Sequence, residues 1–96
     1  MNILFIISHH NAINALSGLT KACTRRNQSY ECFFTGEGVN LLQDKNIKII
    51  TGNSSSSIVC EYSWQKYYGN TKSGIKEGSQ TDLSSMIGPN VKVVSM

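Results

Sequence analysis

Cys60 is the residue best placed to do chemistry, because it lies where two sequence patterns meet. The apolar run Ile58-Val59 leads into it, and a polar-aromatic segment, residues 62–68, follows and ends at Gly69. This pattern predicts a buried strand ending at Cys60 and a helix that stops at Gly69. A thiol there lies near helix N-terminal amides, which favour the thiolate, at the strand end where parallel sheets gather their ligands. The alternative is a small core residue, since free cysteine is often buried.

Four other side chains are candidate neighbours of this thiol. His9 and His10 follow the first apolar run, and histidines beside a thiol lower its pKa or orient a substrate. The alternative is a pair of surface histidines in a polar turn. Trp64 comes one helical turn after Cys60, where it would cover the thiol or fill a subunit interface. Glu61 opposes the thiolate, because a nearby carboxylate raises a thiol's pKa unless it points away.

The remaining sequence features exclude several classes of site. Cys32 lies in an aromatic strand and Cys23 on the apolar face of a helix, so both are expected in the core. Three cysteines without a Cys-x-x-Cys pair indicate a reducing compartment and not a disulfide scaffold. One cysteine and two adjacent histidines are a poor zinc set, so no metal is expected. No glycine-rich nucleotide loop and no Ser-His-Asp arrangement stand out, so no organic cofactor is expected.

The composition indicates one small globular domain covering residues 1–96. The chain is 40% hydrophobic and 16% charged, and its net charge of +3 is too small to argue for nucleic acid. Arg25-Arg26 is the only adjacent basic pair, and a solvated helix end explains it. Residues 1–7 are apolar but lack a basic leader and are too short to span a bilayer, so they are predicted to form the first strand. A soluble, cytoplasmic protein with no membrane partner is expected.

The order of apolar runs and breakers predicts an α/β fold. Strands are expected at residues 3–7, 30–35, up to Cys60, and 91–95; helices are expected at 11–26, 62–68 and from the Ser79–Asp82 cap onward. Residues 39–48 suit a short helix and 47–51 suit a strand or a helix, and periodicity leaves that choice open. Strands alternating with helices predict a flavodoxin-like three-layer sandwich with a small, mostly parallel sheet. In the flavodoxin strand order, the loop at residues 8–11 would lie next to Cys60.

Several of these elements together resemble the DsrE/DsrF-like family, which includes the TusD-type sulfur-relay subunits. The matching segments are the opening strand, the run Phe33-Phe34-Thr35-Gly36-Glu37-Gly38-Val39, the Val59-Cys60 junction with its helix, and Gly78-Ser79-Gln80-Thr81-Asp82-Leu83. The resemblance covers nearly the whole chain, and the Phe-Phe-x-Gly-x-Gly-Val element is its most specific part. The chain differs from longer members in its short segment between Val39 and Cys60 and in its serine-rich loop.

The resemblance implies a small sulfur-relay subunit in which the cysteine matched by Cys60 carries a persulfide. Such a subunit accepts sulfane sulfur from one protein and passes it to another, and it assembles into trimers, hexamers or related complexes. The loop at His9 and His10 would shape the substrate pocket, together with Trp64.

Two other functions stay open on the sequence. In the first, the protein is an oligomeric binding protein without chemistry, in which Cys60 is structural and Trp64 lies at an interface. In the second, it binds a nucleotide or flavin, for which Thr51-Gly52-Asn53 is the only support. That run resembles a flavodoxin phosphate loop but leads directly into a strand and not into a helix.

Overall fold

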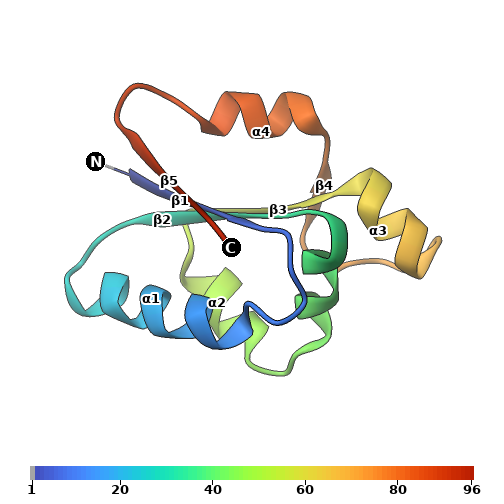
Figure 1. The fold of residues 1–96 in the computed structure, drawn as a ribbon, viewed down its shortest axis with the longest axis horizontal. Coiled ribbons are helices and arrows are strands. Elements are labelled where there is room, and N and C mark those ends of the chain that lie inside the picture. The colour runs from blue at the N-terminus through green and yellow to red at the C-terminus, as the bar shows by residue number, and fades with distance from the viewer. Residues whose placement is uncertain (1) are drawn as a thin grey trace.

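A computed structural model of the protein describes residues 2–96, which form a five-stranded, all-parallel sheet flanked by helices (Figure 1). The strands are β1 (Asn2–Ile7), β2 (Tyr30–Phe34), β3 (Ser56–Cys60), β4 (Lys76–Gly78) and β5 (Val91–Ser95). The helices are α1 (Ile13–Arg25), the 3-10 helix η1 (Gly36–Gln43), α2 (Ile47–Asn53), α3 (Glu61–Tyr68) and α4 (Gln80–Met86).

The α/β sandwich expected from the sequence is confirmed. Helices α1 and α2 lie on one face of the sheet and α4 lies on the other (Figure 1). Alternate residues of the central strands therefore enter two separate core clusters, which explains their continuous apolar runs. The cluster on the α1 side contains Phe5, Ile7, Cys32, Phe34 and Val59, and the cluster on the α4 side contains Leu4, Phe33, Ile58 and Cys60.

The helix boundaries follow the local signals in the sequence. Helix α3 stops at Gly69, whose φ of 61° is available to glycine at little cost. Helix α4 begins with a capping box, in which the Ser79 side chain accepts from the backbone and the Asp82 side chain accepts from the Ser79 N–H at 2.8 Å. The sequence correctly predicted the end of α3 at Gly69 and the start of α4 at the Ser79–Asp82 cap.

The order of the strands differs from the flavodoxin order and corrects one prediction about the site. The sheet runs β4-β3-β2-β1-β5, so β2 separates β1 from β3. The loop after β1 is therefore two strand spacings from Cys60, about 10 Å away, and does not adjoin it. The switch in strand order lies between β1 and β5 instead. It is there that the Ser8 N–H donates to the Met96 carbonyl at 2.7 Å.

The structure decides one segment that the sequence left open and adds one strand that was not predicted. Residues 47–51 belong to the helix α2, in which Ile47 and Ile50 are buried three residues apart and Tyr30 donates its hydroxyl to the Ile50 carbonyl at 2.5 Å. Strand β4 was not predicted, because its three residues are polar or glycine and lie at the sheet edge with no apolar alternation.

The longest helix in residues 2–96 is α1 with 13 residues, and none of the described helices is long and apolar enough to cross a bilayer.

Close backbone packing joins the end of β1 to the turn after β2. Gly36 has a φ of 54°, in the left-handed region that favours glycine. A Cβ atom at Gly38 would lie 2.1 Å from the Ile7 carbonyl oxygen, so only glycine fits at this position. Thr35 completes the contact by donating its backbone N–H to the same Ile7 oxygen at 2.9 Å. The Gly-x-Gly run is therefore needed to bring η1 against the carboxyl edge of the sheet.

Replacing Gly38 with alanine should destabilise the protein by about 2–3 kcal/mol, because two backbone segments would have to move apart. Gly18→Ala is the matched control. A Cβ at Gly18 meets nothing within 4 Å in α1, so that change should stabilise the protein by about 0.5–1 kcal/mol. Urea unfolding measures both values, and equal stability of Gly38→Ala and wild type would contradict the packing described here.

Candidate functional site

Cys60 joins the end of β3 to the start of α3. It is the last residue of the strand and the N-cap of the helix, with extended backbone angles of φ −61° and ψ 116°. At an N-cap the side chain points toward the free amides of the first turn. The backbone N–H groups of Tyr62 and Ser63 help to lower the pKa of the Cys60 thiol, although the side chain makes no capping hydrogen bond to the helix. The predicted strand-to-helix junction at Cys60 is therefore present, and the sulfur lies at the start of α3.

Two hydroxyl groups, those of Ser63 and Thr35, also lower the pKa of the thiol. Ser63 lies in the first turn of α3, and its Oγ accepts the Gly36 N–H at 2.9 Å. That bond leaves the Ser63 hydroxyl hydrogen free to donate to Cys60. Thr35 follows β2, the strand paired with β3, and its hydroxyl also favours the thiolate of Cys60.

These contacts set the charge preference of the thiol. Burial raises the pKa of Cys60, but the hydrogen bonds from Ser63, Thr35 and Tyr62 outweigh it and lower the pKa from the ordinary value of 9.0. Glu61 is exposed to solvent, so its carboxylate is directed away from the core that contains the sulfur. The other two cysteines differ. Burial raises the pKa of Cys23, and it raises the pKa of Cys32 to about 12.

The thiol is also well buried, and this limits how a reagent reaches it. Only 6% of the Cys60 surface is exposed, and the residue packs with Leu4, Phe33 and Ile58 on the α4 side of the sheet. The covering side chains from α4, Leu83 and Met86, are themselves only partly buried. On this side of the sheet, the cluster that contains Cys60 is therefore covered by α4, a helix of seven residues. No residue of α4 is itself fully buried.

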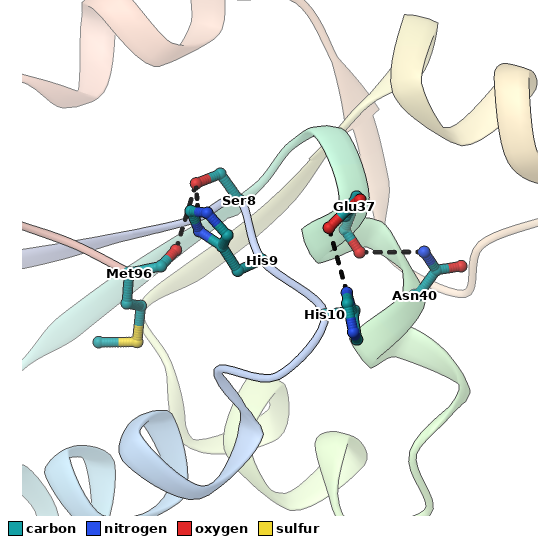
Figure 2. A network of polar contacts seen from close by, with 6 residues as sticks. All are labelled: Ser8, His9, His10, Glu37, Asn40 and Met96. Atoms are coloured by element: carbon teal, nitrogen blue, oxygen red, sulfur yellow. Dashed lines mark hydrogen bonds and ion pairs between the residues drawn. The ribbon is translucent and has the colours of Figure 1, made fainter.

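The two histidines lie in a polar network at the carboxyl end of β1, separate from Cys60 (Figure 2). His10 Nδ1 is 3.1 Å from Glu37 Oε1, and both side chains are more than half exposed. His9 Nδ1 lies 3.3 Å from Ser8 Oγ, which also donates to the Met96 carbonyl. The network connects β1, β5 and η1 and does not include Cys60.

Trp64 is also directed away from the thiol. It belongs to the core cluster on the α1 side, is 1% exposed, and stacks on Tyr68 with ring centroids 4.3 Å apart. Its indole N–H donates to the Thr71 carbonyl at 2.5 Å. Trp64 therefore fixes α3 and the following loop to the core, and it neither covers Cys60 nor presents its ring on the surface of the chain.

Sequence reasoning missed Ser63 and Thr35, although one of them left a signal. Ser63 stands three residues after Cys60, and the N3 position of a helix faces its N-cap. A Cys-x-x-Ser spacing at a strand-to-helix junction therefore indicates a hydroxyl beside the thiol. Thr35 gave no such signal, because its contact depends on β2 and β3 being neighbours.

No protein-family model matches this chain, and neither a curated protein nor a solved structure matches it.

Cys60 should react with iodoacetamide at neutral pH before Cys23 or Cys32, because the thiolate is the attacking species. Cys23 is a matched internal control, because it is 7% exposed and Cys60 is 6% exposed. The pKa of Cys23 is raised, whereas the pKa of Cys60 is lowered. The Cys60 rate should also level off at a lower pH than the Cys23 rate. Peptide mapping after brief alkylation measures this, and labelling of Cys32 first would contradict the burial of β2.

Ser63→Ala should raise the Cys60 pKa, because it removes a hydroxyl donor to the sulfur. It should also cost about 1 kcal/mol of stability, since the Gly36 N–H loses its acceptor. Thr35→Val should raise the pKa in the same direction, and the exposed Ser84→Ala should leave it unchanged. Ultraviolet absorbance of the thiolate against pH measures all three variants, and an unchanged titration in Ser63→Ala would refute its role as a donor.

Proposed function

We propose that the protein is a small persulfide carrier of the DsrE/DsrF-like, TusD-type sulfur-relay class, with Cys60 as the sulfur-carrying residue. The observation that supports this most directly is the set of donors around the sulfur. The amides and hydroxyls at the start of α3 and after β2 lower the pKa of a thiol that burial alone would raise. A merely structural cysteine has no need of four donors, whereas a sulfur nucleophile needs its anion stabilised.

The proposed reaction is a transfer of one sulfur atom in two displacements. The Cys60 thiolate attacks the outer sulfur of a donor persulfide, R–S–SH. A new sulfur–sulfur bond forms, the donor's bond breaks, and the donor leaves as its thiolate, so that Cys60 becomes Cys60–S–SH. An acceptor thiolate then attacks the same outer sulfur, and Cys60 leaves as a thiolate. The two steps are formally redox-neutral and need neither a metal nor an organic cofactor.

The same contacts assist the second step. A thiol with a lower pKa is a better leaving group in such exchanges. Because the donors come from the backbone of α3 and from side chains fixed by other contacts, they are already in place before the sulfur becomes charged. Ser63 in particular is oriented by its bond from the Gly36 N–H.

One observation favours a different function. Cys60 is 6% exposed and shares an apolar cluster with Leu4, Phe33 and Ile58, as a structural cysteine would. In that alternative the protein is an oligomeric binding protein without catalytic chemistry, and the lowered pKa of Cys60 has no functional role. An inert Cys60 thiol in the folded protein would favour this alternative.

Assembly and partners are part of the proposal. A homo-oligomer, a trimer or a hexamer, and donor and acceptor proteins in the cytoplasm follow from the family resemblance. On α3, next to Cys60, Tyr62 is 77% exposed and Tyr67 is 43% exposed, and these rings are suitable contacts for such partners. Trp64 is excluded from that role because it is buried within the chain.

Cys60→Ser should abolish sulfur loading while leaving the fold intact, because oxygen is nearly isosteric with sulfur but cannot hold the transferred atom as a persulfide. Mass spectrometry of the native protein after incubation with a sulfane-sulfur donor measures the added sulfur.

Two control variants should load like the wild type. Cys23→Ser removes a cysteine of matched burial. His9→Ala changes the histidine loop, which β2 separates from Cys60. Equal loading of Cys60→Ser and wild type would refute the carrier function and leave the binding protein as the better account.

A further inference from the structure

A second candidate site lies between α1 and α2, away from Cys60. The two helices lie on the same face of the sheet (Figure 1). Residues of both helices line a cavity of about 430 Å³. This volume is within the range of small-molecule sites, about 300–1,000 Å³. Its lining residues are Ser17, Thr20, Lys21, Thr24, Arg25, Tyr30, Asn46, Ile49, Ile50 and Asn53.

The lining follows from the spacing of residues on the two facing helices. Ser17, Lys21 and Arg25 recur every four residues along one side of α1. Asn46 and Asn53 lie seven residues apart, on one side of α2. Residues at these spacings share a helix face, so both helices direct a polar stripe into the same cavity.

The donors of this cavity lack partners within residues 2–96. Neither Lys21 nor Arg25 forms an ion pair there, and the hydroxyl of Ser17 makes no hydrogen bond. The side-chain amides of Asn46 and Asn53 are likewise unbonded within this part of the chain. Among the lining residues none is acidic, so two positive charges face the cavity with no negative charge to balance them.

The remaining polar groups are already used, which shows what kind of ligand the cavity suits. Thr20 and Thr24 donate their hydroxyls to carbonyls of α1, and Tyr30 donates to the Ile50 carbonyl. The Tyr30 ring and Ile50 are buried and form an apolar floor, while Ile49 stands 67% exposed at the rim. The cavity therefore combines free donors and positive charge with an apolar wall.

We propose that this cavity binds a small organic anion, a carboxylate or phosphate carried on an apolar body. The anionic group lies between Lys21 and Arg25, with Ser17 and the two asparagine amides as further donors. The apolar body lies against Ile49 and the floor. Binding also relieves the repulsion between the two cations, which lie four residues apart on α1.

This site is independent of the proposed sulfur chemistry. Tyr30 opens β2 and Asn53 precedes β3, so the cavity lies toward the amino edge of the sheet. Cys60 closes β3 at the opposite edge. Of the adjacent pair Arg25-Arg26, only Arg25 lines the cavity, so one of these cations has a role beyond a solvated helix end.

Titration of the ¹⁵N-labelled protein with phenyl phosphate and with benzoate, followed by NMR, tests the proposal. At least one of these anions should shift the amide signals of α1 and α2 in a saturable way. The anion that binds with the higher affinity identifies the preferred anionic group. Benzyl alcohol, which has the ring without the charge, should bind about tenfold more weakly or not at all.

Charge-removing variants sharpen the test. Lys21→Gln and Arg25→Gln should each weaken binding of the anion about tenfold, because each removes one charged donor. Lys92→Gln, an exposed change of equal charge on β5, should leave the affinity unchanged. The spectra themselves report that each variant is folded. Absence of shifts on α1 and α2 with both anions, equal binding of benzyl alcohol, or unchanged affinity in both α1 variants would overturn the proposal.

Discussion

The hydrogen bond from the Gly36 N–H to Ser63 Oγ, 2.9 Å long, is the contact on which the site depends. It joins the turn after β2 to the first turn of α3, two segments 27 residues apart in the chain. Because Ser63 accepts from Gly36, its own hydrogen stays available as a donor, and this hydroxyl lowers the pKa of Cys60. Gly36 has a left-handed backbone conformation, and the absence of a side chain at Gly38 lets the turn pack directly against the Ile7 carbonyl.

The strand order determines which polar groups can cooperate. Because β2 lies between β1 and β3, the carboxyl edge of the sheet is divided into two regions. One contains Cys60, Thr35 and Ser63, and its donors converge on sulfur. The other contains the network of His9, His10 and Glu37, which lies where β1 meets β5 (Figure 2). The proposed chemistry on Cys60 therefore relies on neutral hydrogen-bond donors and not on a histidine base.

Local signals in the sequence determined much of this structure. The continuous apolar runs predicted a parallel sheet covered on both faces, because such strands have no solvated side. Gly69 and the Ser79–Asp82 capping box marked helix ends, since both act through bonds between residues a few positions apart. The position of Cys60 at a strand-to-helix junction was also readable from the sequence.

Only the tertiary structure determined which strands are neighbours. The strand order in turn determined which side chains from other elements lie beside Cys60. Strand order follows from how the helices pack across the sheet, and no residue in β1 or β3 encodes that they are separated. Thr35 is therefore beside Cys60, whereas the histidine loop is not. The sequence also did not reveal which way the Trp64 side chain points. Its place in the α1-side cluster depends on how α3 packs against η1 and the following loop. The sequence thus determined the elements and the local cap around the sulfur, and long-range packing determined its other partners.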